Sequence, residues 1–178
     1  MIYSLYVGYF FGSISGFFTV SPDLRLASQS GLRGILMRAR VKWLDHMSFV
    51  GESGSGHSVV MDGAPELGGR NLGPRPMEML LLGLGGCTAF DVIMMLNKAR
   101  QKVDDCVVEL SAERSDQVPK VFTSIHVHFV VTGRDLAESH VKRAVDLSAE
   151  KYCSASRMLE KTAKITHDYE IVESFGEG

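Results

Sequence analysis

The chain has 178 residues, of which 45% are hydrophobic, and a formal net charge of -2. This length and composition suit one globular domain with a sizeable core, and the small net charge gives no sign of a nucleic-acid or anionic-membrane partner. Three cysteines are too few, and an odd number, for a secreted disulfide scaffold. We therefore expect reduced thiols and a cytoplasmic protein in which any disulfide is transient.

Residues 1–36 differ in composition from the rest of the chain. The stretch from Ile2 to Val20 carries no charge and is rich in Tyr, Phe and Gly. A secretory signal would place positive charge before the apolar run, and a membrane span would contain fewer Tyr, Ser and Gly residues. The favoured interpretation is an extension that is not part of the fold, and a signal or membrane anchor stays an alternative. The favoured interpretation predicts a domain over residues 37–173 and a short tail over residues 174–178.

Alternating apolar residues predict three strands in the first half of the domain, joined by short turns. They cover residues 37–43, 48–53 and 57–63. A loop over residues 64–75 leads to Pro76, which suits the first turn of a helix. We expect this helix to run to about Lys102 and to be buried at the centre of a domain or dimer, because it is apolar on nearly all sides.

The second half alternates strands and helices. Strands are predicted over residues 107–114 and 121–132, and Asp135 followed by Glu138 has the form of a capping box. A second helix to about Tyr152, a short helix over residues 154–162 and a last strand over residues 164–172 complete the order βββ-α-ββ-αα-β.

Two of the cysteines lie in contexts that favour chemistry. Cys87 lies in an apolar helix interrupted by Gly83, Gly85 and Gly86. The apolar surroundings exclude water, and glycines allow another backbone to approach closely, so Cys87 suits a guarded nucleophile with Cys153 as its partner. Each glycine costs about 1 kcal/mol of helix stability relative to Ala, which predicts close packing there.

The other polar candidates have plainer interpretations. Cys106 is expected to be an inert thiol that precedes a strand, and His126 and His128 to lie on an exposed sheet face. Asp91, one turn after Cys87, either forms a hydrogen bond at the site or caps a polar spot in an interface. No spacing typical of zinc ligands is present, so we expect no metal.

Two segments resemble the OsmC/Ohr family of osmotically inducible and organic-hydroperoxide-resistance proteins, and most closely its YhfA-like branch. They are Arg75-Pro-Met-Glu-Met-Leu-Leu-Leu-Gly-Leu-Gly-Gly-Cys87 and Leu147-Ser-Ala-Glu-Lys-Tyr-Cys153-Ser, whose cysteines are 66 positions apart. The resemblance covers about residues 37–172. It implies an α+β, OsmC-like fold with antiparallel sheets around a long buried central helix. It also implies an intertwined homodimer with two active sites at its interface.

The resemblance further implies a peroxiredoxin-like organic hydroperoxide reductase that acts in oxidative or osmotic stress. Cys87 would become a sulfenic acid and then form a disulfide with Cys153. No cofactor is bound in such a protein, and an external dithiol or lipoyl-type reductant restores the thiols. In the family a glutamate holds an arginine beside the first cysteine. The candidates here are Glu78, nine positions before Cys87 where ten is usual in the best-characterised peroxidases, and Arg40.

Some alternatives remain open. Arg70 and Arg75 are substitutes for Arg40, because the first hairpin, from Leu44 to Gly56, contains no arginine. The same fold also serves a binding protein that holds a small apolar or redox-active ligand in the dimer-interface pocket with little turnover. A thiol redox sensor is a third possibility. Loss of peroxide consumption on Cys87→Ser would distinguish the enzyme from the binding protein.

Overall fold

The structure, a computed structural model, describes residues 36–174. Except for Leu36, the extension expected at residues 1–36 lies outside the described residues. The same holds for the tail expected at residues 174–178, except for Ser174. In chain order the strands and helices are β1 (Ala39–Asp45), β2 (Ser48–Ser53), β3 (Ser58–Met61), α1 (Pro76–Lys98), β4 (Lys102–Arg114), β5 (Phe122–Arg134), α2 (Glu138–Leu147), α3 (Ser154–Leu159) and β6 (Lys164–Glu173). This confirms the predicted order of elements and the α+β class.

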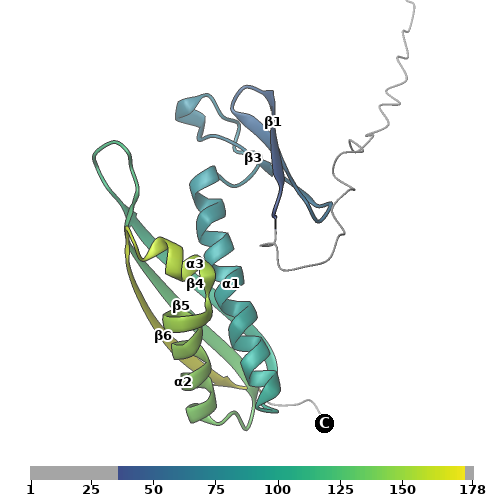
Figure 1. Cartoon of the computed structure of the whole chain (residues 1–178), viewed down its shortest axis with the longest axis vertical. Coiled ribbons are helices and arrows are strands. Elements are labelled where there is room, and N and C mark those ends of the chain that lie inside the picture. The colour runs from purple at the N-terminus through teal and green to yellow at the C-terminus, as the bar shows by residue number, and fades with distance from the viewer. Residues whose placement is uncertain (1–35, 175–178) are drawn as a thin grey trace, which may run out of the picture.

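The strands form two separate sheets of three (Figure 1). In the first, β1–β2–β3 is antiparallel throughout, and it lies at the N-terminal end of α1. In the second, β4 and β5 are antiparallel, but β6 runs parallel to β5. The expectation of purely antiparallel sheets is wrong for this last pair, because α2 and α3 form the crossover that returns the chain to the starting end of β5.

The main core lies between the β4–β6 sheet and the helices that cover one of its faces (Figure 1). From α1 it takes Leu84, Val92 and Leu96, which share this core with the apolar side of β5. Alternation along residues 121–132 predicts an apolar side made of Thr123, Ile125, Val127, Phe129 and Val131. The last four are buried, as predicted, whereas Thr123 is exposed and Phe122, expected on the opposite side, is buried.

The long helix α1 is buried on one side only in the single chain. Its buried residues are Leu84, Gly85, Thr88, Val92 and Leu96. The opposite side leaves Leu82 58% exposed and Phe90 70% exposed. By length and composition α1 could also cross a membrane, with a mean hydropathy of 2.0. The burial expected on nearly all sides of α1 is therefore not met within the single chain.

Two helix ends differ from prediction. α1 ends at Lys98 instead of about Lys102, because Arg100 adopts a left-handed φ of 55° and the chain turns directly into β4. Cys106 therefore lies within β4 and does not precede it. The predicted capping box at Asp135 is also wrong. The N-cap of α2 is Ala137, and Asp135 instead has a φ of 50° while its backbone N–H donates to Glu173.

The loop before α1 is organised around the buried carboxylate of Asp62. It accepts hydrogen bonds from the backbone N–H groups of Gly63 at 2.8 Å, Arg70 at 3.0 Å and Leu72 at 3.0 Å. These bonds, that from Leu72 above all, lower the pKa of Asp62 from 3.8 to about 2, against the opposing effect of burial. The carboxylate thus holds both ends of the loop that leads to α1.

We expect Asp62→Asn to destabilise the fold at neutral pH and to remove part of its acid sensitivity. A carboxyl group whose pKa is lower in the folded chain stabilises the fold above its unfolded pKa of 3.8, and this contribution is lost as the pH falls towards 2. Thermal unfolding across that pH range measures both effects. The matched control is Asp116→Asn at an exposed position, and an equal response of the two variants would contradict this role.

Candidate active site

Cys87 is held on a side of α1 that lies next to the packed face. The turn before it approaches β4 closely, because a Cβ added at Gly85 would lie 2.8 Å from Leu110 Cδ1. Thr88 is buried, and its hydroxyl donates to the carbonyl groups of Leu84 and Gly85. The close packing predicted from the glycines is therefore confirmed at Gly85. At Gly83 and Gly86 nothing of the described chain lies within 4 Å of an added Cβ.

Cys153 reaches the same place through a break in the second helix. After α2 ends at Leu147, residues Ser148–Tyr152 form a π-helical turn, and the backbone N–H of Cys153 donates to the Ser148 carbonyl at 3.0 Å. The sequence predicted a regular helix up to about Tyr152. A π-helical turn widens the helix by one residue and is frequent at functional sites. Here it ends the helix so that Cys153 becomes the N-cap of α3 and points into the core.

The structure brings three reactive groups together. The sulfur atoms of Cys87 and Cys153 and a carboxylate oxygen of Asp91 all lie within 4.8 Å of one another. Both thiols are free, Cys153 is fully buried, and Cys87 and Asp91 are half-buried. The predicted pairing of the two cysteines in space is thus present, and of the two interpretations of Asp91 the one at the site holds.

Backbone and hydroxyl groups orient this cluster. The hydroxyl of Ser148 lies 3.2 Å from the Thr88 carbonyl and 3.4 Å from Asp91 Oδ2, and it donates to these acceptors. The backbone N–H of Ser156 donates to Cys153 Sγ at 3.4 Å. Ser148 was not singled out in the sequence, because its role depends on the π-helical turn that places it against α1.

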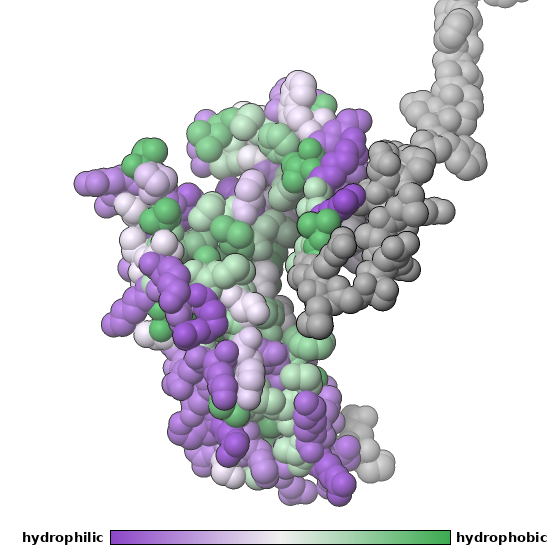
Figure 2. Space-filling view, viewed as in Figure 1, coloured by the Kyte–Doolittle hydropathy of each residue, from purple (hydrophilic) through white to green (hydrophobic). Residues whose placement is uncertain are grey.

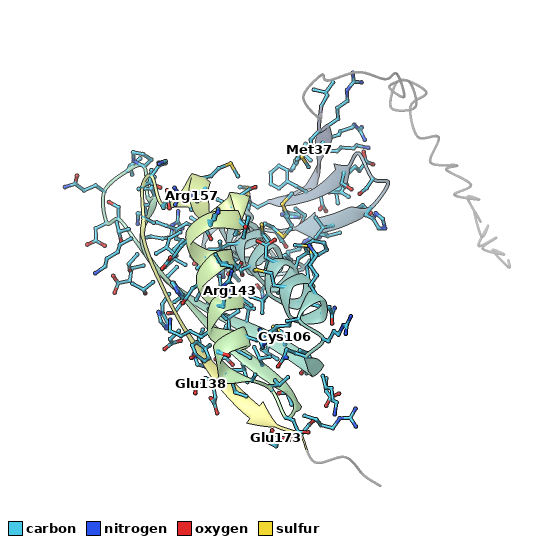
Figure 3. The ribbon with its side chains drawn as sticks, turned by 60° about the horizontal axis from the view of Figure 1, so that its bottom comes forward. Met37, Cys106, Glu138, Arg143, Arg157 and Glu173 are labelled. Atoms are coloured by element: carbon cyan, nitrogen blue, oxygen red, sulfur yellow. The ribbon has the colours of Figure 1, made fainter. Side chains whose placement is uncertain are left out.

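The electrostatics distinguish the thiols. Burial raises the pKa of Cys153, the neighbouring Cys87 adds to this, and hydrogen bonding from Ser156 opposes it. Burial also raises the pKa of Cys106, with a contribution from Asp105. Cys106 lies in β4, well separated from Met37 and the β1–β3 sheet (Figure 3). A raised pKa reduces the thiolate population of Cys153 and Cys106. Cys87 is half-buried and lies in the cluster, so it is the better candidate for the attacking thiol.

The predicted activating pair is engaged elsewhere in the single chain. Arg40 donates to Glu52 at 2.7 Å on the exposed β1–β2 surface. Glu78 accepts from the backbone of Arg75 at 2.9 Å and from its guanidinium at 3.1 Å. α1 is regular from Pro76 onward, so the nine residues from Glu78 to Cys87 place them on opposite faces.

The substitute arginines do not reach the thiols either. Arg70 donates to Asp45 at 2.5 Å, and Arg75 is the partner of Glu78. Within residues 36–174, no hydrogen bond joins Cys87 to any of the four candidates, which are Arg40, Arg70, Arg75 and Glu78. The single chain therefore supplies a carboxylate beside its two thiols, where the sequence comparison led us to expect an arginine.

A separate cavity of about 470 Å³ opens beside the first turns of α1. Its lining is mostly apolar and includes Met47, Phe49, Met77, Leu81 and Phe122. The charged residues in the lining are Asp62, Arg75, Glu78 and Arg114. Hydrophobic surface gathers where the β1–β3 sheet meets the start of α1, whereas the surface of α2 is mostly hydrophilic (Figure 2). Glu78 thus belongs to this cavity and not to the cysteine cluster.

Comparisons with known proteins agree with the site and the fold. The family model for OsmC-like proteins matches residues 68–168, which include both cysteines of the cluster. The chain belongs to the OsmC-like family. It is 54% identical to protein YhfA of Escherichia coli strain K12 over 136 residues, which cover 76% of this chain and 98% of that protein. The resemblance predicted from the two cysteine segments is confirmed.

Solved structures of other OsmC-like proteins share the fold at much lower identity. The OsmC-like protein of Mycoplasma pneumoniae is 18% identical, with a TM-score of 0.66, over 77% of this chain and 97% of that one. The organic hydroperoxide resistance protein OsmC of Legionella pneumophila is 16% identical, with a TM-score of 0.60, over 79% of this chain and 99% of that one. At this distance the likeness establishes the fold alone.

We expect alkylation of the reduced protein to modify Cys87 before Cys153 and Cys106. Cys87 is half-buried, whereas burial raises the pKa of the other two thiols. Timed iodoacetamide labelling followed by peptide mass spectrometry gives the three rates on the same sample, and unfolded protein provides the intrinsic rates. If Cys153 reacted first, the assignment of the attacking thiol would be wrong.

Proposed function

We propose that this protein reduces organic hydroperoxides with Cys87 and Cys153 in defence against oxidative or osmotic stress. The observation that carries the proposal is the proximity of the two free thiols, one half-buried and one fully buried. Membership of the OsmC-like family supports it, as does the shared fold of the Legionella pneumophila protein, which is an organic hydroperoxide resistance protein.

The chemistry balances with a dithiol as reductant. The Cys87 thiolate attacks one peroxide oxygen, the O–O bond breaks, and an alcohol leaves with a proton from solvent, so that Cys87 becomes a sulfenic acid. The Cys153 sulfur then attacks the Cys87 sulfur and displaces water, which forms the disulfide. An external dithiol or lipoyl-type reductant returns both thiols by disulfide exchange and is itself oxidised.

The residues around Cys87 favour an alkyl or aryl hydroperoxide over hydrogen peroxide. Beyond the cluster, α1 presents an apolar groove that begins at Gly86, next to Cys87, and would form one wall of a site between the two copies of the homodimer proposed below. It is lined by Ala89, Phe90, Ile93, Met94, Asn97 and Lys98. An apolar substituent gains free energy by leaving water for such a surface, at about 25 cal/mol per Å². Hydrogen peroxide has no such substituent and gains nothing there.

A second copy of the chain would complete the site, so the proposal includes a homodimer. The outer face of α1 exposes Leu82 and Phe90 and carries Gly83 and Gly86, at which an added Cβ meets nothing in the chain. β1 is also exposed, with Val41 62% and Trp43 61% accessible. An apolar helix face with glycines suits close helix packing between two copies, which would bring β1 and Arg40 of one copy towards the other.

A ligand-binding function is the second candidate, and one observation favours it. Arg75 and Glu78 line the cavity of about 470 Å³ and contribute no charge at Cys87. A mostly apolar cavity with a few polar groups is typical of a small-molecule site. In that case the cavity would hold a small apolar ligand, and the cysteine pair would contribute little turnover.

We expect the reduced protein to consume cumene hydroperoxide catalytically with an excess of dithiol, and Cys87→Ser to bring the rate down to that of the dithiol alone. Cys153→Ser should allow oxidation of Cys87 but stop the disulfide, so that a sulfenic acid accumulates and reacts with dimedone. Cys106→Ser is the matched control and should retain full turnover, because Cys106 lies outside the cluster. Turnover that survives Cys87→Ser would exclude this mechanism.

We expect Phe90→Glu to convert a dimer into a monomer. Phe90 is 70% exposed in the single chain and lies at the centre of the proposed interface, where a buried, unpaired carboxylate is strongly unfavourable. Sedimentation analysis over a range of concentrations measures the effect. Val118→Glu is the control, at an apolar residue that is 88% exposed in the loop between β4 and β5. A wild-type chain that stays monomeric throughout would contradict the dimer.

A further inference from the structure

The cysteine cluster contains more than the peroxide mechanism uses. The two sulfurs would suffice to form a disulfide, but the carboxylate of Asp91 lies within 4.8 Å of both of them. Cys87 and Asp91 are four residues apart on α1, so their side chains lie on the same face, one turn apart. Cys153 approaches from the π-helical turn after α2. Side chains from two separate elements thus converge on one point.

We propose that the reduced protein binds one zinc ion through Cys87 Sγ, Cys153 Sγ and a carboxylate oxygen of Asp91. Zinc is bound by thiolate, imidazole and carboxylate groups in tetrahedral geometry, and a site with three protein ligands leaves the fourth position to water. The cluster supplies three ligand atoms of suitable type. Cys87 and Asp91 are half-buried, which leaves a side from which the ion and its water can enter.

The distances suit this ion. Zinc lies about 2.3 Å from thiolate sulfur and about 2.0–2.2 Å from carboxylate oxygen, so ligand atoms around it are about 3.5–3.8 Å apart. The three atoms here are separated by no more than 4.8 Å. Movements of the ligand atoms by about 1 Å would therefore bring them to the separations of a zinc site.

The charge of the cluster also favours a cation. A zinc ion requires thiolates, and each thiol gives up its proton to solvent when it binds the metal. Two thiolates and a carboxylate carry three negative charges in a partly buried place. Within residues 36–174, no arginine or lysine side chain forms a hydrogen bond or ion pair with the cluster, and a divalent cation would offset most of that charge.

The groups around the ligands already orient them. The Ser148 hydroxyl lies 3.4 Å from Asp91 Oδ2, and the Ser156 N–H donates to Cys153 Sγ. Partners of this kind fix the direction of metal ligands, and their loss typically reduces metal affinity by about 10–100-fold. The sequence predicted no metal. Cys87 and Asp91 lie in α1, whereas Cys153 comes 62 positions after Asp91, and this is not a spacing typical of metal ligands.

Binding of the metal does not depend on the proposed peroxidase activity, because it requires only the reduced thiols and the carboxylate. The two are nevertheless linked, since both use the same sulfur atoms. Bound zinc would occupy the thiols and block their oxidation. Formation of the Cys87–Cys153 disulfide would remove two of the three protein ligands and release the ion.

The test is a Co²⁺ titration of the full-length, reduced, metal-free protein, followed by displacement with Zn²⁺. Thiolate ligands give intense charge-transfer absorption with Co²⁺, and native mass spectrometry gives the number of ions per chain. We expect one ion per chain and a loss of affinity of at least about tenfold for Cys87→Ser and for Asp91→Asn. Ser148→Ala should weaken binding without removing the charge-transfer band.

Two control variants test other candidate metal-binding groups. Cys106→Ser removes the remaining thiol, and His128→Gln removes a histidine that bonds to Asp168 at 2.6 Å on the exposed sheet face. Both should bind Co²⁺ as the wild type does. Cys87 and Asp91 are half-buried, so their variants are expected to fold, and circular dichroism checks this for each. Unchanged affinity in Asp91→Asn or Cys87→Ser, or no thiolate absorption in the wild type, would overturn the proposal.

The outcome can be separated from that of the peroxidase assay. Metal binding without peroxide turnover would support the zinc site and reject the enzyme, and turnover without any metal binding would do the reverse. If both proposals hold, one equivalent of Zn²⁺ added to the reduced protein after removal of the dithiol should slow the single oxidation of Cys87 by one equivalent of peroxide, and a chelator should restore its rate.

Discussion

The packing of one side of α1 against the β4–β6 sheet is the interaction on which the rest of the structure depends. Leu84, Val92 and Leu96 are fully buried there, and each such side chain stabilises the fold by about 1.5–3 kcal/mol. This packing fixes the rotation of the helix about its axis. It follows that Cys87 and Asp91 point towards α3 and the turn before it, and that Phe90 points away from the chain.

The position of Cys153 depends on the π-helical turn between α2 and α3. Val141, Ala144 and Val145 anchor α2 in the same core, so the end of α2 is fixed relative to α1. The turn then sets where Cys153 lies and directs the Ser148 hydroxyl to the Thr88 carbonyl and Asp91. The two cysteines lie close together because α1 and α2 pack on the same sheet. A disulfide would add a covalent bond where the two side chains are already neighbours.

Much of the fold could be predicted from the sequence, and what could not be predicted depends on long-range packing. Alternation along residues 121–132 correctly gave the buried face of β5, and the two cysteine segments gave the family. Helix ends were less predictable, because Arg100 ends α1 through its backbone conformation, which no apolar pattern encodes. The direction of β6 was missed for a similar reason, since a strand has the same side-chain pattern in a parallel or an antiparallel sheet.

The site was predicted in part, and there is a physical reason why some of its residues were predicted and others were not. Two cysteines with matching sequence contexts indicated the pair, but activation by Arg40 and Glu78 was inferred from other members of the family. Here Glu78 is offset by one position, and a shift of one residue rotates a helical side chain by about 100° around the axis. It consequently pairs with Arg75 beside the cavity, and Arg40 pairs with Glu52. Asp91 and Ser148 take places at the cluster that only the fold reveals.

The cysteine cluster requires a positive charge to balance its ionised groups. Two thiols and a carboxylate in a partly buried place cannot all be ionised without a nearby cation, because removing charge from water is costly. An arginine from a second copy would stabilise the Cys87 thiolate alone and leave Cys153 protonated, which suits attack on a peroxide. A zinc ion would stabilise both thiolates and prevent that attack. The two cations therefore favour different protonation states of Cys153, whose pKa burial already raises. Since the ion and the guanidinium would compete for the same sulfur, the chain would be either reactive or metal-bound, according to which cation is present.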